Sequence, residues 1–465
     1  MVELAVVGLC LVTIIGVYFW NNPLRHSRRF VWRRFLNWFP LGMTYSFLYM
    51  GRYNLVACKD ALGTAMPNHE FGDIFAIGTL VYAGSFLING PLIDMIGGKK
   101  GILIGGFGAA AMNVLMGIVT YEYTTGHGRG SLFAPLAVLY GLNMYFQSYG
   151  AVSIIKVKSY WFHVRERGVF GAIFGSLISI GLYFAFDWND ALLKRYSISA
   201  VFFVPAAIIV AWCVCDLWAV VDEPQQVGFP AFDTHDASSG HMDDHYTYLD
   251  YLGKVFASPL MWMVALIELT SGVFRNGFQQ WYKPFAQQVP AAADKFVSNH
   301  LGFLLCVTGI FAGLCAGLAS DKLFQSRRGP PAGFLSAAVL LLAVAMWYSF
   351  RIHPTVFAWS GLVIVMGSVG ITSLMSGTAA ADFGGRKATA TCAGIVDGFA
   401  YLGSGIQSFC LGRLTEVNWH LWPIFFIPFA ILGGSIALRI WNALPPATKR
   451  YLEEVEKKRI ESLAG

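Results

Sequence analysis

The chain has 465 residues, of which 56% are hydrophobic and only 13% are charged. This share of charged residues is about half of the roughly 25% usual in soluble domains, so a soluble protein of this size is excluded, and abundant glycine and aromatic residues instead predict an all-α integral membrane protein. The net charge of +6 comes from basic residues spread over short segments, which indicates no nucleic-acid partner and fits the anionic inner face of a membrane.

Apolar segments of about 18 to 25 residues, each long enough to cross a lipid bilayer, recur along the chain. We expect thirteen of them, at 3–20, 35–57, 72–94, 101–121, 131–154, 168–186, 199–220, 259–285, 300–320, 332–350, 355–378, 389–410 and 420–442.

The first apolar segment differs from the others because it precedes the regular pattern. Glu3 is its only charged residue, so it lacks the basic start of a signal peptide, and no small-residue cleavage site follows. We therefore expect residues 1–21 to form an extra, retained transmembrane anchor.

A hydrophilic stretch divides the remaining twelve segments into six and six. This predicts one six-helix bundle over 22–220, a linker over 221–258, a second bundle over 259–445 and a tail over 446–465. The linker holds three histidines among aspartates, at His235, His241 and His245. A metal site is the weaker interpretation of this pattern and a solvated connector the stronger, so no metal or cofactor is expected.

Lysine and arginine counts predict the orientation in the membrane. With the segment after residue 20 placed inside, the inner side collects 22 of the 33 basic residues and the outer side only 7. We therefore expect a multi-pass protein of the plasma (inner) membrane, with its N-terminus outside and both the linker and the C-terminus in the cytoplasm.

The two halves repeat a charged pattern between their second and third segments. The first half has "GPLIDMIGGKKG" and the second has "AGLASDKLFQSRRG". Such a repeat is typical of transporters whose site lies between two related bundles. At the cytoplasmic edge these residues are expected to cap helices and to latch the halves as gating residues: Asp94, Lys99, Lys100, Asp321, Arg327 and Arg328.

Arg52 and Arg275 lie inside apolar segments, at similar depth in the first helix of each half. An arginine at this depth costs about 3 kcal/mol, so it must face a cavity or a partner. Polar residues at helical spacing share these faces, which points to a hydrated path between the bundles. The polar residues are Tyr45 and Tyr49 beside Arg52; Glu268, Ser271, Gln279 and Tyr282 beside Arg275; Asn143 and Gln147; and Asp397, Tyr401, Ser404 and Ser408.

Two guanidinium groups facing one cavity suit a ligand with a compact dianionic head, because each can bind phosphate oxygens through two parallel donors. We expect the substrate to contact Arg52, Arg275, Tyr45, Tyr49, Gln147 and Gln279. Glu268 and Asp397 are expected to act as counter-charges or in coupling. The alternative is structural pairing, of Arg275 with Glu268 or of Arg52 with Asp397. No arrangement of nucleophile and base is apparent, and an enzyme is not expected.

The chain resembles the organophosphate:phosphate antiporter family of the major facilitator superfamily over nearly all of residues 30 to 445. "TYSFLYMGRYNL" is similar to the family's first helix and "FRNGFQQWYKPF" to its seventh. "VDEPQQVGFP" resembles the opening of its linker, "ASDKLFQSRRG" a loop of its second half, and "KATATCAGIVDGFAYLGSG" its eleventh helix. The resemblance implies that Arg52 and Arg275 hold phosphate and that Tyr45 and Tyr49 line the same pocket.

The chain departs from the family pattern at three places. "SYGAVSI" replaces a GWPP-type stretch after Gln147, Ile178 stands where several members have a histidine, and Asp397 replaces a small residue. The resemblance implies a monomeric secondary transporter in the lipid bilayer that exchanges an organophosphate, of sugar phosphate or glycerol phosphate type, for inorganic phosphate. The alternatives are a proton-coupled carrier of another organic anion and a sugar-phosphate sensor that does not transport.

Overall fold

The computed structural model describes residues 2–20, 22–127, 130–163, 166–230, 257–323, 329–375 and 380–442, and it is helical throughout these ranges without a strand. The expected all-α class is therefore confirmed. Seven of the described helices are long and apolar enough to cross a membrane. His235, His241 and His245, the tail, Arg327 and Arg328 lie outside the described residues.

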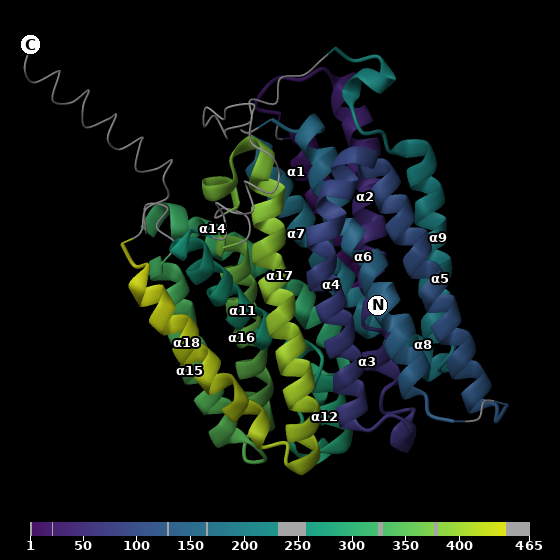
Figure 1. The fold of residues 1–465 in the computed structure, drawn as a ribbon, viewed down its shortest axis with the longest axis vertical. Helices are drawn as coiled ribbons and strands as arrows, with labels where there is room; N and C mark the ends of the chain where they lie inside the picture. The colour runs from purple at the N-terminus through teal and green to yellow at the C-terminus, as the bar shows by residue number, and fades with distance from the viewer. Residues whose placement is uncertain are drawn as a thin grey trace, which may run out of the picture.

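The helices coincide with the apolar segments of the sequence (Figure 1). The N-terminal part contains α1 (Val2–Trp20), α2 (Arg28–Arg52), α3 (Asn54–Cys58), α4 (Asn68–Ile96), α5 (Gly98–Thr124), α6 (Phe133–Trp161), α7 (Arg167–Tyr183), α8 (Asn189–Arg195) and α9 (Ala200–Ala219). The C-terminal part contains α11 (Pro259–Gln279), α12 (Tyr282–Gln288), α13 (Lys295–Asn299), α14 (Leu301–Leu323), α15 (Gly329–Ser349), α16 (Pro354–Leu374), α17 (Ala380–Val417) and α18 (Leu421–Arg439).

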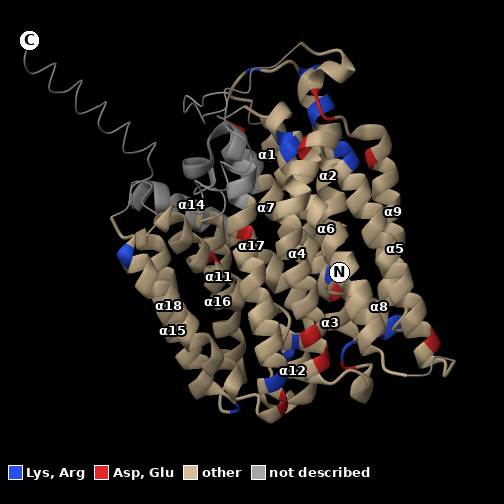
Figure 2. Ribbon diagram, viewed as in Figure 1, with Lys and Arg blue, Asp and Glu red and all other residues tan. Residues whose placement is uncertain are grey.

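The helices pack in two neighbourhoods that meet along two helix pairs. In the first, α4, α5 and α6 pack together, and α2 packs on α7 and α9. In the second, α15 packs on α16 and α18, and α11 packs on α16 and α17. The junction consists mainly of α4 against α17 and α7 against α14. Figure 2 shows charged residues gathered toward the two ends of the molecule with few between them, as a bilayer requires.

One end of this junction, where α4 begins and α17 ends, is closed by direct backbone contact. A Cβ atom added at Gly72 on α4 would overlap the carbonyl oxygen of Ser408 and lie 3.0 Å from the Cα atom of Gly412, both on α17. Only glycine allows the two helices to approach so closely. We call this end of the molecule the sealed end.

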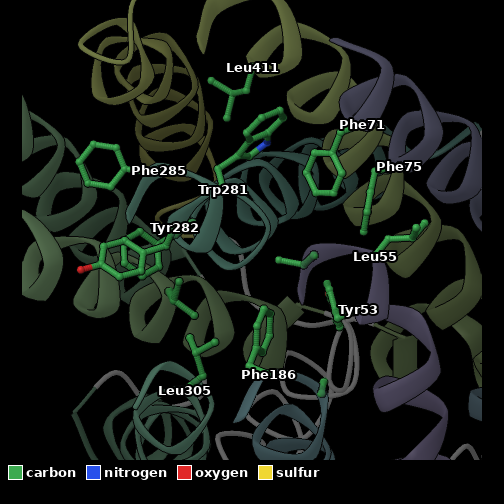
Figure 3. Close-up of a cluster of buried hydrophobic side chains, with 14 of the residues drawn as sticks. Tyr53, Leu55, Phe71, Phe75, Phe186, Trp281, Tyr282, Phe285, Leu305 and Leu411 are labelled. Atoms are coloured by element: carbon green, nitrogen blue, oxygen red, sulfur yellow. The ribbon is translucent and has the colours of Figure 1, made fainter. Parts of the chain in front are cut away.

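Aromatic residues from both neighbourhoods fill the sealed end (Figure 3). The rings of Phe71 and Trp281 meet edge to face at 5.4 Å, and Phe186 packs against Tyr53 at 5.3 Å. Such contacts contribute about 0.5–1.5 kcal/mol each beyond the area that they bury. The cluster therefore excludes water between the halves at this end.

Polar contacts across the junction also lie at the sealed end. Arg413 binds Asp73 at 2.7 Å. The Asp187 carboxylate accepts hydrogen bonds of 2.8 Å from the backbone N–H groups of Gly302 and Phe303 at the start of α14. A carboxylate is favoured at this position because the first N–H groups of a helix lack partners within the helix.

Helix α1 packs on α7 and is bound at both of its ends. Near its C-terminus, the Tyr18 hydroxyl accepts a hydrogen bond of 3.0 Å from Arg34, and Arg34 forms an ion pair of 2.9 Å with Glu166. Near its N-terminus, Glu3 contacts His300, which precedes α14. The helix thus touches both neighbourhoods.

The Glu166 carboxylate holds the Tyr18 end of α1 in place, and its loss should destabilise the protein. Burial by itself raises the pKa of Glu166, but His26 and Arg34 outweigh that effect and lower the pKa to about 2. Since the folded-state pKa is depressed, the stabilisation is fully present above about pH 5 and is lost as the pH falls toward 2.

Glu166→Gln should therefore lower the unfolding temperature of the detergent-solubilised protein at pH 7 by roughly 2–5 °C. The difference in unfolding temperature between Glu166→Gln and the wild type should shrink as the pH falls from 5 toward 2. Thermal unfolding at several pH values would measure this difference. Glu122→Gln, at an exposed position, is the matched control and should change nothing. An equal effect of both variants would contradict the assigned role of Glu166.

Candidate functional site

Arg52 lies at the C-terminal end of α2, and its side chain is only 2% exposed. Its Nε atom donates to Gln147 Oε1 on α6, and its Nη1 atom donates to the Tyr401 hydroxyl on α17, both at 2.9 Å. Its Nη2 atom is buried and has no hydrogen-bond partner among the described residues. The guanidinium therefore joins the two neighbourhoods and keeps unused donor capacity.

Three tyrosine rings surround the Arg52 guanidinium. Its carbon atom lies 4.6 Å from the ring centre of Tyr49, 4.8 Å from that of Tyr82 and 5.9 Å from that of Tyr401. Each ring face attracts a cation, so the tyrosines partly replace the water that a buried arginine loses. Tyr45, expected at this site, packs edge to face on Tyr49 at 5.5 Å. Tyr82 on α4 was not among the predicted site residues, although its segment carries other polar residues at helical spacing from it.

A chain of amide side chains supports Arg52 from behind. Gln147 Nε2 donates to Asn143 Oδ1 at 3.2 Å, and Asn113 donates to the same oxygen at 3.1 Å. Asn113 in turn accepts from Asn54. Because Gln147 donates to Asn143, its carbonyl oxygen faces Arg52. The amides therefore fix the orientation of the guanidinium.

Arg275 on α11 faces the same region from the other neighbourhood. It forms no hydrogen bond or ion pair with the residues that the structure describes, and its electrostatic neighbours are Tyr401, Glu268, Tyr49 and Tyr53. Next to it, Asn276 accepts a hydrogen bond of 2.9 Å from the Tyr53 hydroxyl, which connects the neighbourhoods on the sealed side of the arginines.

Close contact between α11 and α17 sets the register of this half of the site. A Cβ atom at Gly272 would overlap the Ala400 carbonyl oxygen, and one at Gly403 would overlap the Leu269 carbonyl oxygen. The two backbones therefore touch at the level of Arg275 and Tyr401, and the side chains on either side of the contact share one space.

Glu268 and Asp397 lie near this space, on the same two helices. Glu268 is fully buried, and neither of its carboxylate oxygens has a hydrogen-bond partner in the described part of the chain. Arg275, Asp397 and Thr372 are its neighbours. No ion pair joins Glu268 to either arginine among the described residues, although Arg275 is its electrostatic neighbour. Gln279 is buried at the end of α11.

The family model of the Major Facilitator Superfamily matches residues 34–408. The chain belongs to the Major Facilitator Superfamily. In keeping with this, a bacterial homologue of the human lysosomal transporter Spinster, solved in an inward-facing and unoccupied conformation, has the same fold. It superposes with a TM-score of 0.66 at 13% identity and covers 89% of this chain and 98% of its own.

Relatives of this superfamily member span most of its length. The membrane sensor protein UhpC of Salmonella typhimurium is 25% identical over 93% of this chain and 98% of its own. A probable hexose phosphate transport protein of Chlamydia pneumoniae is 26% identical over 69% of this chain and 74% of its own. The glycerol-3-phosphate transporter of Bacillus subtilis is 24% identical over 80% of this chain and 84% of its own. These relatives match the organophosphate:phosphate antiporter family that the sequence resembles.

Three of the expected gating residues of this facilitator lie at the end opposite the sealed end: Asp94, Lys99 and Lys100. Asp94 forms an ion pair of 2.8 Å with Lys156, which lies on α6 in the same neighbourhood. The Lys99 side chain donates to the Leu217 carbonyl, and its backbone N–H donates to Asp222, both at 2.8 Å. Lys100 begins α5 beside Lys99. The Asp321 side chain is not among those described.

The amide support of Arg52 can be tested at Gln147. Gln147→Leu removes the acceptor of the Arg52 Nε proton, and losing one charge-assisted hydrogen bond should weaken the binding of an anion at this guanidinium about 10-fold. The dissociation constant of inorganic phosphate, used as a test anion with the purified protein, should therefore rise. Gln287→Leu, at an exposed position on α12, is the matched control. Unchanged phosphate affinity in Gln147→Leu would show that the amide does not position the arginine.

Proposed function

We propose that this facilitator is a secondary active transporter that exchanges an organophosphate, of sugar phosphate or glycerol phosphate type, for inorganic phosphate. The observation that carries the proposal is Arg52, a buried cation with an unused donor and no acidic partner among the described residues. A buried charge without a counter-ion is costly, so the site is complementary to an anion. The relatives named as hexose phosphate and glycerol-3-phosphate transporters support a phosphorylated one.

In this proposal the substrate phosphate binds between Arg52 and Arg275, one from each bundle. Each guanidinium offers two parallel N–H donors, which match the geometry of phosphate oxygens. Tyr45, Tyr49 and Gln147 complete the pocket on the first-bundle side, and Gln279 lies on the second-bundle side. The bundles are 22–220 and 259–445, joined by the cytoplasmic linker 221–258, with an additional anchor at 1–21.

Transport follows from the charge of the site. With phosphate bound, the two arginines are neutralised and the bundles can rock about the junction of α4 with α17 and of α7 with α14. In the orientation that the basic residues favour, the sealed end lies on the outer side of the membrane. The protein then loads on one side, reorients and releases on the other side of the plasma (inner) membrane.

Counterflow in proteoliposomes tests this proposal. Vesicles loaded with unlabelled phosphate should accumulate radiolabelled phosphate, and external glycerol 3-phosphate or glucose 6-phosphate should compete. Empty vesicles should accumulate little, because exchange needs a substrate on both sides. Equal uptake by loaded and empty vesicles would contradict exchange and favour a proton-coupled carrier.

A sugar-phosphate sensor is the second candidate, because relatives from two bacteria are named membrane sensor protein UhpC. A sensor and a transporter use the same anion site and differ in whether the loaded protein reorients. Ligand-induced thermal stabilisation together with an absence of counterflow would assign the sensor function, whereas binding with counterflow would assign transport.

A further inference from the structure

The Glu268 carboxylate is the largest unexplained polar group near the two arginines. It is completely buried, and neither oxygen accepts a hydrogen bond from the described residues. The hydroxyl groups beside it are engaged with each other, since Ser271 lies 2.8 Å from Thr372 and also donates to the Ser368 carbonyl at 2.9 Å. A carboxylate in such surroundings needs a proton or a cation.

Its location relative to the proposed phosphate site is fixed by the helices. Glu268 precedes Arg275 by two helical turns, about 10 Å along α11, and its neighbour Asp397 precedes Tyr401 by one turn, about 6 Å along α17. Contact between these helices at Gly272 and Gly403 holds both acids on the same side of the arginines. A ligand whose phosphate binds the arginines would thus extend its organic part toward Glu268.

The charges of the site also favour a cation at this place. The Glu268 carboxylate is buried without a hydrogen-bond donor among the described residues, and Arg275 is among its electrostatic neighbours. A negative charge on Glu268 would repel a phosphate bound at Arg275. A positive group carried by the same ligand offsets part of this charge, and a neutral sugar cannot.

We infer that the site selects phosphate esters that carry a primary ammonium group on their organic part, such as an amino sugar phosphate. The ammonium group donates to the Glu268 carboxylate, with Asp397 adding to the negative potential and the Tyr401 ring nearby. This inference rests on the proposed function, because it assigns the phosphate to Arg52 and Arg275.

Two ligands that differ at a single group test the inference. Glucosamine 6-phosphate has an amine where glucose 6-phosphate has a hydroxyl. In competition with labelled phosphate for binding to the purified protein, glucosamine 6-phosphate should bind at least 10-fold more tightly to the wild type. In Glu268→Gln the two ligands should differ by less than 2-fold, whatever the affinity of that variant for inorganic phosphate. Glu268→Asp keeps the charge and should retain part of the preference, and Glu122→Gln should retain all of it.

Each result has a distinct meaning. A wild type that binds both hexose phosphates equally, or a Glu268→Gln variant that keeps the preference, overturns the inference and leaves the phosphate site intact. Equal binding of the two ligands combined with pH-dependent exchange that Glu268→Gln abolishes also overturns it, because Glu268 then takes a proton. If the wild type binds no phosphate compound at all, the proposed function fails, and the inference fails with it.

Discussion

Arg52→Lys and Arg275→Lys should each reduce phosphate exchange at least ~100-fold, although both keep the positive charge. Lysine presents a point charge without the planar pair of donors. At position 52 it would also lose one of the two contacts that hold the guanidinium, to Gln147 and to Tyr401. Loss of two charge-assisted hydrogen bonds costs about 3–6 kcal/mol, which corresponds to a factor of at least 100.

Counterflow of radiolabelled phosphate in proteoliposomes measures this effect. Arg195→Lys, at an exposed position ending α8, is the matched control and should exchange phosphate normally. Thermal unfolding of each variant would show that the protein still folds. Near-normal exchange by either Arg52→Lys or Arg275→Lys would refute a phosphate site shared between the bundles.

Gly72→Ala should strongly reduce transport and change phosphate binding little. The added Cβ atom overlaps the Ser408 carbonyl oxygen and approaches Gly412, and backbone atoms cannot rotate away as a side chain can. The sealed end can then close only if α4 and α17 move apart. We expect exchange to fall at least ~10-fold, because forcing helices apart in a packed core costs about 1–3 kcal/mol or more.

Gly84→Ala on the same helix is the control, since a Cβ atom there meets nothing within 4 Å. If the sealed end opens in Gly72→Ala, a cysteine introduced at the buried position Thr415 should become reactive toward a membrane-impermeant maleimide. Phosphate binding to the purified variant should stay within about 3-fold of the wild type. Normal exchange by Gly72→Ala would show that the close approach of α4 and α17 is not part of the transport cycle.

The sequence was sufficient to predict the positions of the helices, because each apolar segment has the length of a membrane span and clear polar borders. It also marked Arg52, Arg275, Gln147 and Glu268 as candidate site residues, which stay predictions, because a polar group inside an apolar helix is unusual by itself. Tyr45 and Tyr49 were predicted to share a face with Arg52 because they lie at helical spacing from it.

Contacts between helices could not be read from the sequence. Tyr82 on α4 lies against the Arg52 guanidinium on α2, and this contact between two helices cannot be read from either segment alone. Gly72 and Gly272 look like many other glycines in membrane helices. Only their contact with the backbone of α17 shows that these two allow a close approach between helices. Likewise, Asp94 meets Lys156 from a helix that its local sequence does not indicate. Helical periodicity describes one helix at a time, whereas these features belong to pairs.

The hydrogen bond between Arg52 and Tyr401 has a consequence for how occupancy is recognised. The phenolic oxygen of Tyr401 occupies one of the donors that a phosphate oxygen would need, at 2.9 Å, and it comes from the opposite side of the junction. In the proposed exchange cycle this hydroxyl takes the place of a substrate oxygen at the Arg52 guanidinium. An anion that binds Arg52 must displace the Tyr401 hydroxyl. Substrate binding would therefore also break a hydrogen bond between the two bundles.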